Sequence, residues 1–160
     1  PLTKWLMESG VLENVRAMAQ LPELAMRLEK VAEYHASQGT TIGVHRIHGD
    51  FAPWNSSWTK EGLFVFDWEE SRAHGLALGD AFYYVLAPFM HVGKRRITKA
   101  NIDLAFQFAS GVIAQSGAGE MDIDLYFALW LAEKVATPGQ YRPLFVRAMD
   151  RLQYGERSSI

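Results

Sequence analysis

Hydrophobic and polar residues alternate at helical spacing over most of the chain. A helix is predicted over about residues 11–20, where Val11, Leu12, Val15 and Met18 share one face. A second helix begins at Pro22, since a proline at the first helical position loses no hydrogen bond, and ends at Gly39. Further helices are predicted over residues 81–87, from Thr98 to at least Ile113, over about 122–136 and over about 142–154.

Single residues predict the two ends of one helix, and the composition of a longer segment predicts a buried helix. Asp80 is a plausible N-cap for the helix over residues 81–87, and Pro88 is expected to end it. The segment Leu125–Ala132 is apolar nearly all round, so we expect it to be buried on every side.

Only the centre of the chain carries a β pattern. The β-branched residues between Thr41 and Ile47 predict a short strand. Segments 56–58 and 63–66 flank a turn that contains Gly62, which predicts a hairpin. The expected fold is therefore mainly α with a small central β hairpin (α+β), in a single domain over residues 1–160.

Composition and charge narrow the possible partners. The 160 residues are 49% hydrophobic and 21% charged. The net charge is −2, so the chain lacks the excess of positive charge that is typical of nucleic-acid-binding proteins. It contains no cysteine, which excludes disulfides and thiolate metal sites and is in keeping with a cytoplasmic location. The longest apolar run falls far short of the roughly 20 residues of a membrane span.

Candidate chemistry gathers in His48-Gly-Asp-Phe-Ala-Pro-Trp-Asn55 and in the later Asp67. The carboxylate of Asp50 would accept a proton from an attacking hydroxyl, and the side-chain oxygens of Asn55 and Asp67 suit Mg²⁺. Taken singly, Asp50, Asn55 and Asp67 are each typical of an ordinary turn. Together, their types and spacing favour a site for phosphoryl transfer. Asp67 follows an apolar strand, so we expect it at the end of a buried element, where a carboxylate needs a partner or a metal.

These motifs resemble those of the aminoglycoside phosphotransferase and choline kinase superfamily, relatives of the protein kinases. The resemblance rests on His48–Asn55 with Asp67-Trp68-Glu69, and the later Gly79-Asp80 is similar to an element that supports the catalytic loop in that family. It implies the C-terminal lobe of a protein-kinase-like fold, with Asp50 as catalytic base. Asn55 and Asp67 would bind magnesium and thereby the nucleotide, and His48 and Asp80 would have supporting roles.

The implied activity is transfer of the γ-phosphoryl group of ATP or GTP to a hydroxyl of a small molecule. The acceptor would be an aminoglycoside, another sugar, choline or an amino alcohol. A protein kinase is less favoured, because the chain lacks an Ala-Pro-Glu segment and Asp67 is followed by Trp-Glu rather than Phe-Gly.

One departure from the family is large. The family places a β-rich nucleotide-binding lobe first, and no segment before His48 has that pattern. We therefore expect a truncated C-terminal lobe that is inactive alone and that dimerises through the surface left exposed by the missing lobe. The alternative is a non-catalytic binding or scaffold remnant of such a kinase.

Three tryptophans lie close to the motifs in the sequence, and each has two interpretations. Packing into the core is the default for Trp54, Trp58 and Trp68. The sharper alternative is a stacking or cation–π surface for substrate, formed by Trp54 and Trp68 with the carboxylates of Glu69 and Glu70 attracting a cationic acceptor.

Overall fold

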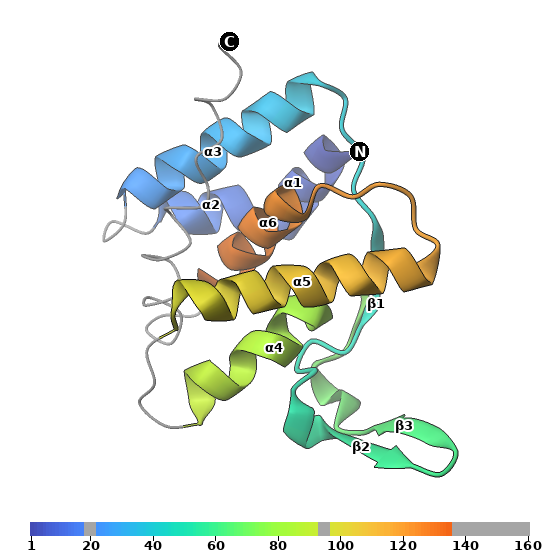
Figure 1. Ribbon diagram of the computed structural model, residues 1–160. Coiled ribbons are helices and arrows are strands. Elements are labelled where there is room, and N and C mark those ends of the chain that lie inside the picture. Colours follow the sequence, from blue (N-terminus) through green and yellow to red (C-terminus); the bar gives the residue numbers. More distant parts are fainter. Residues whose placement is uncertain (18–21, 93–96, 136–160) are drawn as a thin grey trace. The chain divides into compact units, whose positions relative to one another are not determined.

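The computed structural model describes residues 1–17, 22–92 and 97–135 (Figure 1). The helix predicted over residues 142–154 and the end of the helix predicted over residues 11–20 lie outside this part of the chain. The described helices are α1 (Leu2–Ser9), α2 (Val11–Arg16), α3 (Pro22–Ser37), α4 (Gly79–His91), α5 (Lys99–Ser116) and α6 (Ile123–Val135). The strands are β1 (Val44–Ile47), β2 (Ser56–Thr59), β3 (Gly62–Val65) and β4 (Arg72–Leu76).

The chain is mostly helical with two small antiparallel sheets, which confirms the predicted α+β class. Its residues group into two compact units, Pro1–Ile42 with Phe127–Ile160 and Gly43–Tyr126. The expectation of a single domain over residues 1–160 stays a prediction. Every candidate site residue lies in the second unit.

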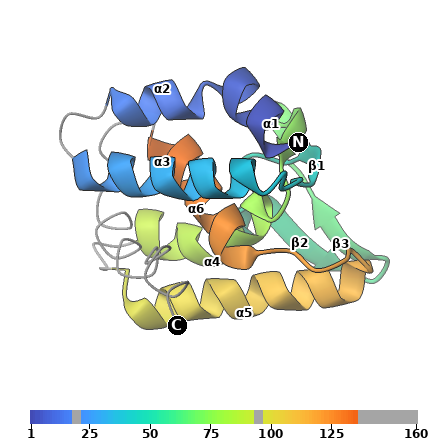
Figure 2. The ribbon, with the colours of Figure 1, turned by 90° about the horizontal axis from the view of Figure 1, so that it is seen from above.

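In the first unit, α3 packs against α1 and α2 (Figure 2). The apolar faces of these helices are buried as the periodicity predicts, with Val11 and Val15 on α2 and Leu28 and Val31 on α3. Helix α3 begins at Pro22, and Gly39 follows its end with a φ of 66°, in the left-handed region that glycine adopts most readily. Both boundaries agree with the sequence. Helix α1 was missed by the sequence analysis.

In the second unit, β2 and β3 form the predicted hairpin, with Trp58 opposite Leu63. Strand β4, which the residue pattern does not predict, pairs with β1 in an antiparallel two-stranded sheet. Gly75 of β4 is required there, because a Cβ at this position would collide with the side chain of Ile47. Figure 1 shows the β2–β3 hairpin extending away from α4 and α5.

Helices α4, α5 and α6 correct two predictions and confirm two others. Helix α4 does not end at Pro88 but continues to His91, and Asp80 does not cap it, because the N-cap position is Leu78. Thr98 caps α5 in a reciprocal arrangement with Asn101, as expected for a helix that begins there. The residues Leu125–Ala132 of α6 are all buried, as their composition predicts.

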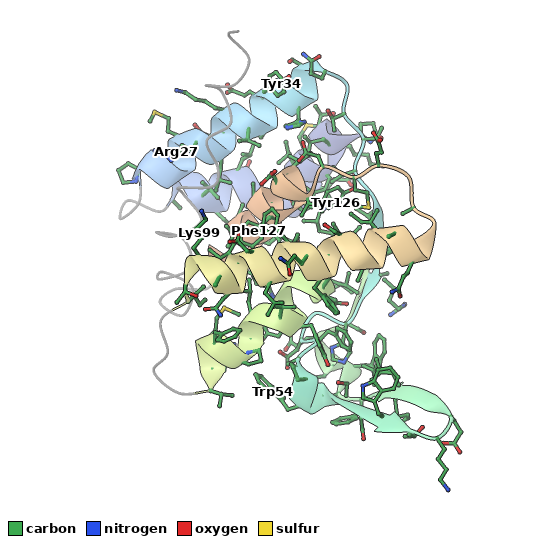
Figure 3. All side chains as sticks on the ribbon, viewed as in Figure 1. Arg27, Tyr34, Trp54, Lys99, Tyr126 and Phe127 are labelled. Atoms are coloured by element: carbon green, nitrogen blue, oxygen red, sulfur yellow. The ribbon has the colours of Figure 1, made fainter. Side chains whose placement is uncertain are left out.

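The hydroxyl of Tyr126, at the end of the second unit, accepts a hydrogen bond from the backbone N–H of Gly43 at its beginning (Figure 3). Burial raises the pKa of this hydroxyl, and the hydrogen bond from Gly43 partly offsets the increase. The contact joins the two ends of the segment that contains the candidate site.

Candidate functional site

Asp50 and Asn55 lie in a tight loop after β1 and are hydrogen-bonded to each other. The side-chain Nδ2 of Asn55 donates to Oδ2 of Asp50 at 2.9 Å and to the carbonyl oxygen of Asp50 at 2.9 Å. Two backbone hydrogen bonds, from Ala52 N to Asp50 O and from Asn55 N to Ala52 O, fold the loop back on itself. Asn55 is buried, so the orientation of the Asp50 carboxylate is set by a side chain that has little room to move.

The backbone of this loop is held by Asp80, at the start of α4. Its Oδ2 accepts a hydrogen bond from His48 N at 2.7 Å, and its Oδ1 accepts one from Gly49 N at 3.0 Å. A carboxylate that accepts two backbone N–H groups forms charge-assisted hydrogen bonds, which are stronger than neutral ones. This contact explains why Asp80 does not act as an N-cap: its carboxylate points to the loop instead of to its own helix.

Replacement of Asp80 by asparagine is expected to lower the free energy of unfolding by about 2 kcal/mol, because the new amide group meets one of the two backbone N–H donors with a donor of its own. Urea denaturation monitored by tryptophan fluorescence measures the change. Glu61→Gln removes the same charge at an exposed turn position and should change stability by less than about 0.5 kcal/mol. Equal effects of the two substitutions would contradict a specific role for Asp80.

The backbone of Phe66, directly before Asp67, is held by both ends of the loop. Phe66 N donates to Asn55 O at 3.1 Å, and Phe66 O accepts from Nε2 of His48 at 2.8 Å. The other ring nitrogen of His48, Nδ1, accepts from Asp50 N at 3.3 Å. In these bonds the buried ring of His48 donates through Nε2 and accepts through Nδ1. These bonds bring the segment that carries Asp67 to the loop that carries Asp50 and Asn55.

Asp67 itself is exposed, which corrects the expectation that it ends a buried strand. The reason is that β2 and β3 form a ribbon of only two strands, and Leu63 and Phe64 remain more than one-third exposed. Asp67 has a φ of 65°, in the left-handed region that aspartate tolerates better than most residues. Such a conformation costs free energy and is often found at functional sites.

The two proposed magnesium ligands offer suitable oxygen atoms. The carboxylate of Asp67 and Oδ1 of Asn55 accept no hydrogen bond from any residue that the structure describes. Mg²⁺ is commonly bound by one or two protein oxygens, with phosphates and water completing its shell. No group of three or more His, Asp or Glu side chains in the described ranges is arranged to hold a metal ion. The oxygens of Asp67 and Asn55 therefore fit a magnesium ion whose other ligands are phosphate and water.

The tryptophans contradict the core-packing interpretation. Trp54, Trp58 and Trp68 are all exposed, Trp58 to 78%, because the two-stranded hairpin and its flanking turns have no core of their own. Trp68 is nevertheless fixed: its Nε1 donates to Val65 O at 3.0 Å, and its ring lies 4.7 Å from that of His48. Trp54 (Figure 3) meets the ring of His91 edge-on at 6.1 Å.

Gly49 lies directly against the backbone of Glu70. A Cβ atom at Gly49 would collide with the carbonyl group of Glu70, and the φ of Gly49 is 87°. Both facts require glycine at this position. The loop with Asp50 and the turn after Asp67 therefore contact each other without an intervening side chain.

A stack of aromatic rings that the sequence analysis missed leads away from the loop. Phe51 stacks on Tyr84 of α4 with a centroid distance of 5.0 Å, and Tyr84 stacks on Phe108 of α5 at 5.6 Å. These rings are 33 and 24 residues apart in sequence. No local pattern indicates such a pairing, because it depends on how α4 packs against α5.

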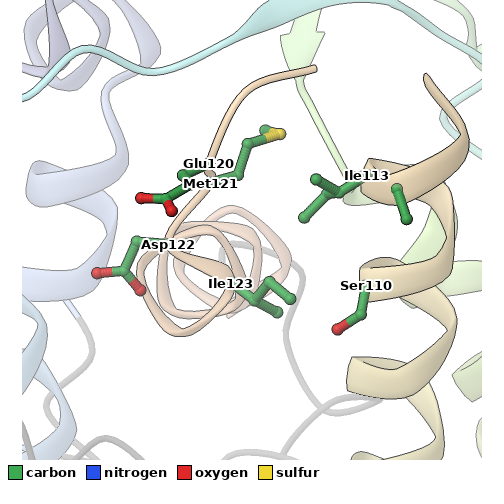
Figure 4. Close-up of a pocket in the computed structure, with 7 residues that line it drawn as sticks. Ser110, Ile113, Glu120, Met121, Asp122 and Ile123 are labelled. Atoms are coloured by element: carbon green, nitrogen blue, oxygen red, sulfur yellow. The ribbon is translucent and has the colours of Figure 1, made fainter. Parts of the chain in front are cut away.

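A hollow of about 610 Å³ lies elsewhere in the same unit, between the end of α5 and the start of α6 (Figure 4). Its walls are formed by the largely apolar set Ser110, Ile113, Ala114, Glu120, Met121, Asp122 and Ile123. Figure 4 shows the carboxylates of Glu120 and Asp122 pointing away from α5. None of the candidate site residues lines this hollow.

The comparisons do not add a relative to these observations. Among the described helices, none combines the length and apolar character needed to cross a membrane. Comparison of the chain with protein-family models, curated proteins and solved structures gave no match.

Proposed function

We propose that the chain carries the phosphoryl-transfer site of a small-molecule kinase. The observation that carries the proposal is one connected set of hydrogen bonds. Asn55 orients the carboxylate of Asp50, Asp80 holds the backbone of the loop, and His48 and Asn55 together hold Phe66, next to Asp67. Phosphoryl transfer depends mainly on such fixed positions and on neutralisation of charge.

In this proposal Asp50 is the proton acceptor. Since its Oδ2 is bonded to Asn55, Oδ1 is the oxygen that faces the acceptor hydroxyl. The hydroxyl oxygen bonds to the γ-phosphorus, the bond from that phosphorus to the β–γ bridging oxygen breaks, and the hydroxyl proton passes to Asp50. The products are the phosphorylated acceptor and a nucleoside diphosphate.

Asn55 and Asp67 would hold the magnesium ion. The ion would neutralise charge on the phosphates of ATP or GTP. Asn55 would then have two functions, because Nδ2 orients Asp50 and Oδ1 would be available to hold the cation. We infer that the fold is the C-terminal lobe of a protein-kinase-like fold, a proposal supported by the order of these motifs and by the helical segments that follow them.

The acceptor is proposed to be a hydroxylated cation, such as an amino alcohol, choline or an aminoglycoside. Trp68 presents an exposed indole that is held in place by His48 and Val65, and Trp54 is exposed near the same loop. An ordered aromatic face attracts cations, and the exposed carboxylates of Glu69 and Glu70 add charge of the opposite sign. These four residues are the candidate acceptor contacts.

Titration calorimetry with Mg·ATP and Mg·GTP tests the proposal. We expect binding that disappears when EDTA removes the metal, and that is at least tenfold weaker in Asp67→Asn, which loses a charged ligand. Glu61→Gln, an exposed acid in the hairpin turn, should bind like the unaltered chain. Nucleotide binding that does not depend on Mg²⁺ or on Asp67 would contradict the assigned ligands.

The calorimetry is paired with a transfer assay on the full-length protein, using choline, ethanolamine and kanamycin as acceptors. Magnesium-dependent phosphorylation of at least one acceptor is the expected result. If the full-length protein showed neither nucleotide binding nor transfer, the kinase proposal would be contradicted. The non-catalytic binding or scaffold alternative would then be favoured.

A further inference from the structure

The loop that carries Asp50 is held on both sides of this residue by one face of α4. Asp80 accepts hydrogen bonds from the backbone N–H groups of the two residues before Asp50. Tyr84 stacks on the ring of Phe51, directly after Asp50, with ring centroids 5.0 Å apart and planes 29° apart. Asp80 and Tyr84 are four residues apart on the helix, so their side chains lie on the same face.

The ring of Tyr84 is held in turn by a second helix. It stacks on Phe108 of α5 with centroids 5.6 Å apart and planes 16° apart, and α4 packs against α5. Within the part of the chain that the structure describes, the hydroxyl group of Tyr84 makes no hydrogen bond. Contact between rings is therefore what joins Tyr84 to the loop and to α5. Stacked aromatic rings have preferred geometries, so such a contact restricts the orientation of Phe51 as well as its position.

The hydrogen bonds of Asp50 itself all stay within the loop from His48 to Asn55, among the residues that the structure describes. They fix the shape of the loop, whereas the contacts with α4 fix its place against the helices. We propose that Tyr84 is a positioning residue for phosphoryl transfer, which keeps Asp50 in place by holding the ring of Phe51. This inference rests on the proposed function, and it adds a residue outside the motifs to the site.

The kinetic constants of transfer by the full-length protein test this role. Tyr84→Leu removes the ring but keeps an apolar side chain, and we expect it to lower kcat about 10- to 100-fold, because a small displacement of the base is costly. The KM for Mg·ATP should change less than about twofold, since Tyr84 acts on the base and not on the magnesium ligands. Tyr84→Phe keeps the ring and should retain the kcat of the unaltered protein. Tyr34→Leu removes a half-exposed tyrosine of α3 and should also retain it.

Coupling between Tyr84 and Phe51 separates positioning from a general loss of stability. Because Tyr84 acts through Phe51, the substitution Phe51→Leu should lower kcat by a similar factor, and the double variant should be no slower than the slower single variant. Two factors that multiply in the double variant would overturn the proposal, as would an unaltered kcat in Tyr84→Leu. Phe51→Leu, at a half-buried position, gives the same test if Tyr84→Leu does not fold.

Amide hydrogen exchange of the chain measures the loop independently of any activity. The N–H of Ala52, which donates to Asp50 O at 2.9 Å, should exchange about tenfold faster in Tyr84→Leu. The N–H of Thr40, which donates to His35 O in the first unit, should keep its rate. Equal exchange at Ala52 with and without the ring would overturn the proposal even if kcat fell. Absence of transfer by the unaltered protein would instead contradict the proposed function, and exchange at Ala52 would still decide whether Tyr84 holds the loop.

Discussion

Replacement of Asp50 by alanine is expected to lower the rate of phosphoryl transfer by about 10²- to 10⁴-fold, the usual contribution of a general base. The carboxylate of Asp50 is the group that would take the proton of the attacking hydroxyl, because both oxygens of Asp80, the other acid bonded to this loop, already accept from the backbone N–H groups of His48 and Gly49. Initial rates of transfer of labelled phosphate by the intact protein measure the effect. Binding of Mg·ATP should change little, because Asp50 is not assigned to the metal.

Asp50→Asn is the matched control for the geometry of the loop. Its side-chain oxygen preserves an acceptor for Nδ2 of Asn55 but has almost no affinity for a proton. We therefore expect Asp50→Asn to be as inactive as Asp50→Ala while it retains more of the stability of the unaltered protein. Turnover that persists in both variants would remove Asp50 from the mechanism.

The substitution Gly49→Ala is expected to lower the free energy of unfolding by about 3 kcal/mol or more, the range of the most damaging single substitutions. Two costs combine at this position. A left-handed φ costs a non-glycine residue about 1–2 kcal/mol, and the added Cβ collides with the carbonyl group of Glu70. Urea denaturation gives the change in stability, and the loss of soluble expression would be its extreme form.

Gly39→Ala separates these two costs. Gly39 also has a left-handed φ, of 66°, but a Cβ there meets no atom of the described residues within 4 Å. Its replacement should cost only about 1 kcal/mol, from the backbone conformation alone. If Gly49→Ala and Gly39→Ala lowered the free energy of unfolding equally, the close contact between Gly49 and Glu70 would not account for any of the loss in stability.

Local signals in the sequence predicted much of the secondary structure. The start of α3 at Pro22, the cap of α5 at Thr98 and the buried character of α6 all depend on residues within one turn of the feature they specify. Helix α1 and β4 were missed. In β4 the informative residue is Gly75, whose importance arises only from contact with Ile47, a distant residue in sequence. Pairing between distant strands leaves little trace in either strand alone.

The candidate site likewise contains contacts that the sequence indicates and contacts that only the fold reveals. The bond between Asp50 and Asn55 lies within six residues, and the motif indicates the pair without knowledge of the fold. The resemblance to known kinases suggested a supporting role for Asp80, but its contacts with His48 and Gly49 span about 30 residues and required the fold. Exposure was the least predictable property. Trp58 is apolar enough for a core, yet it lies on a ribbon that no other described element covers.

The hydrogen bond between Phe66 N and Asn55 O has a consequence for how this region tolerates change in length. It closes the hairpin at its base, so the ten residues between Asn55 and Phe66 form a loop whose two ends are fixed before β2 begins and after β3 ends. Doubling the length of such a loop costs only about 0.6 kcal/mol in closure entropy. Insertions at the Lys60-Glu61 turn should therefore leave Asn55 and Asp67 in register, which makes this turn a natural place to graft a peptide or a label.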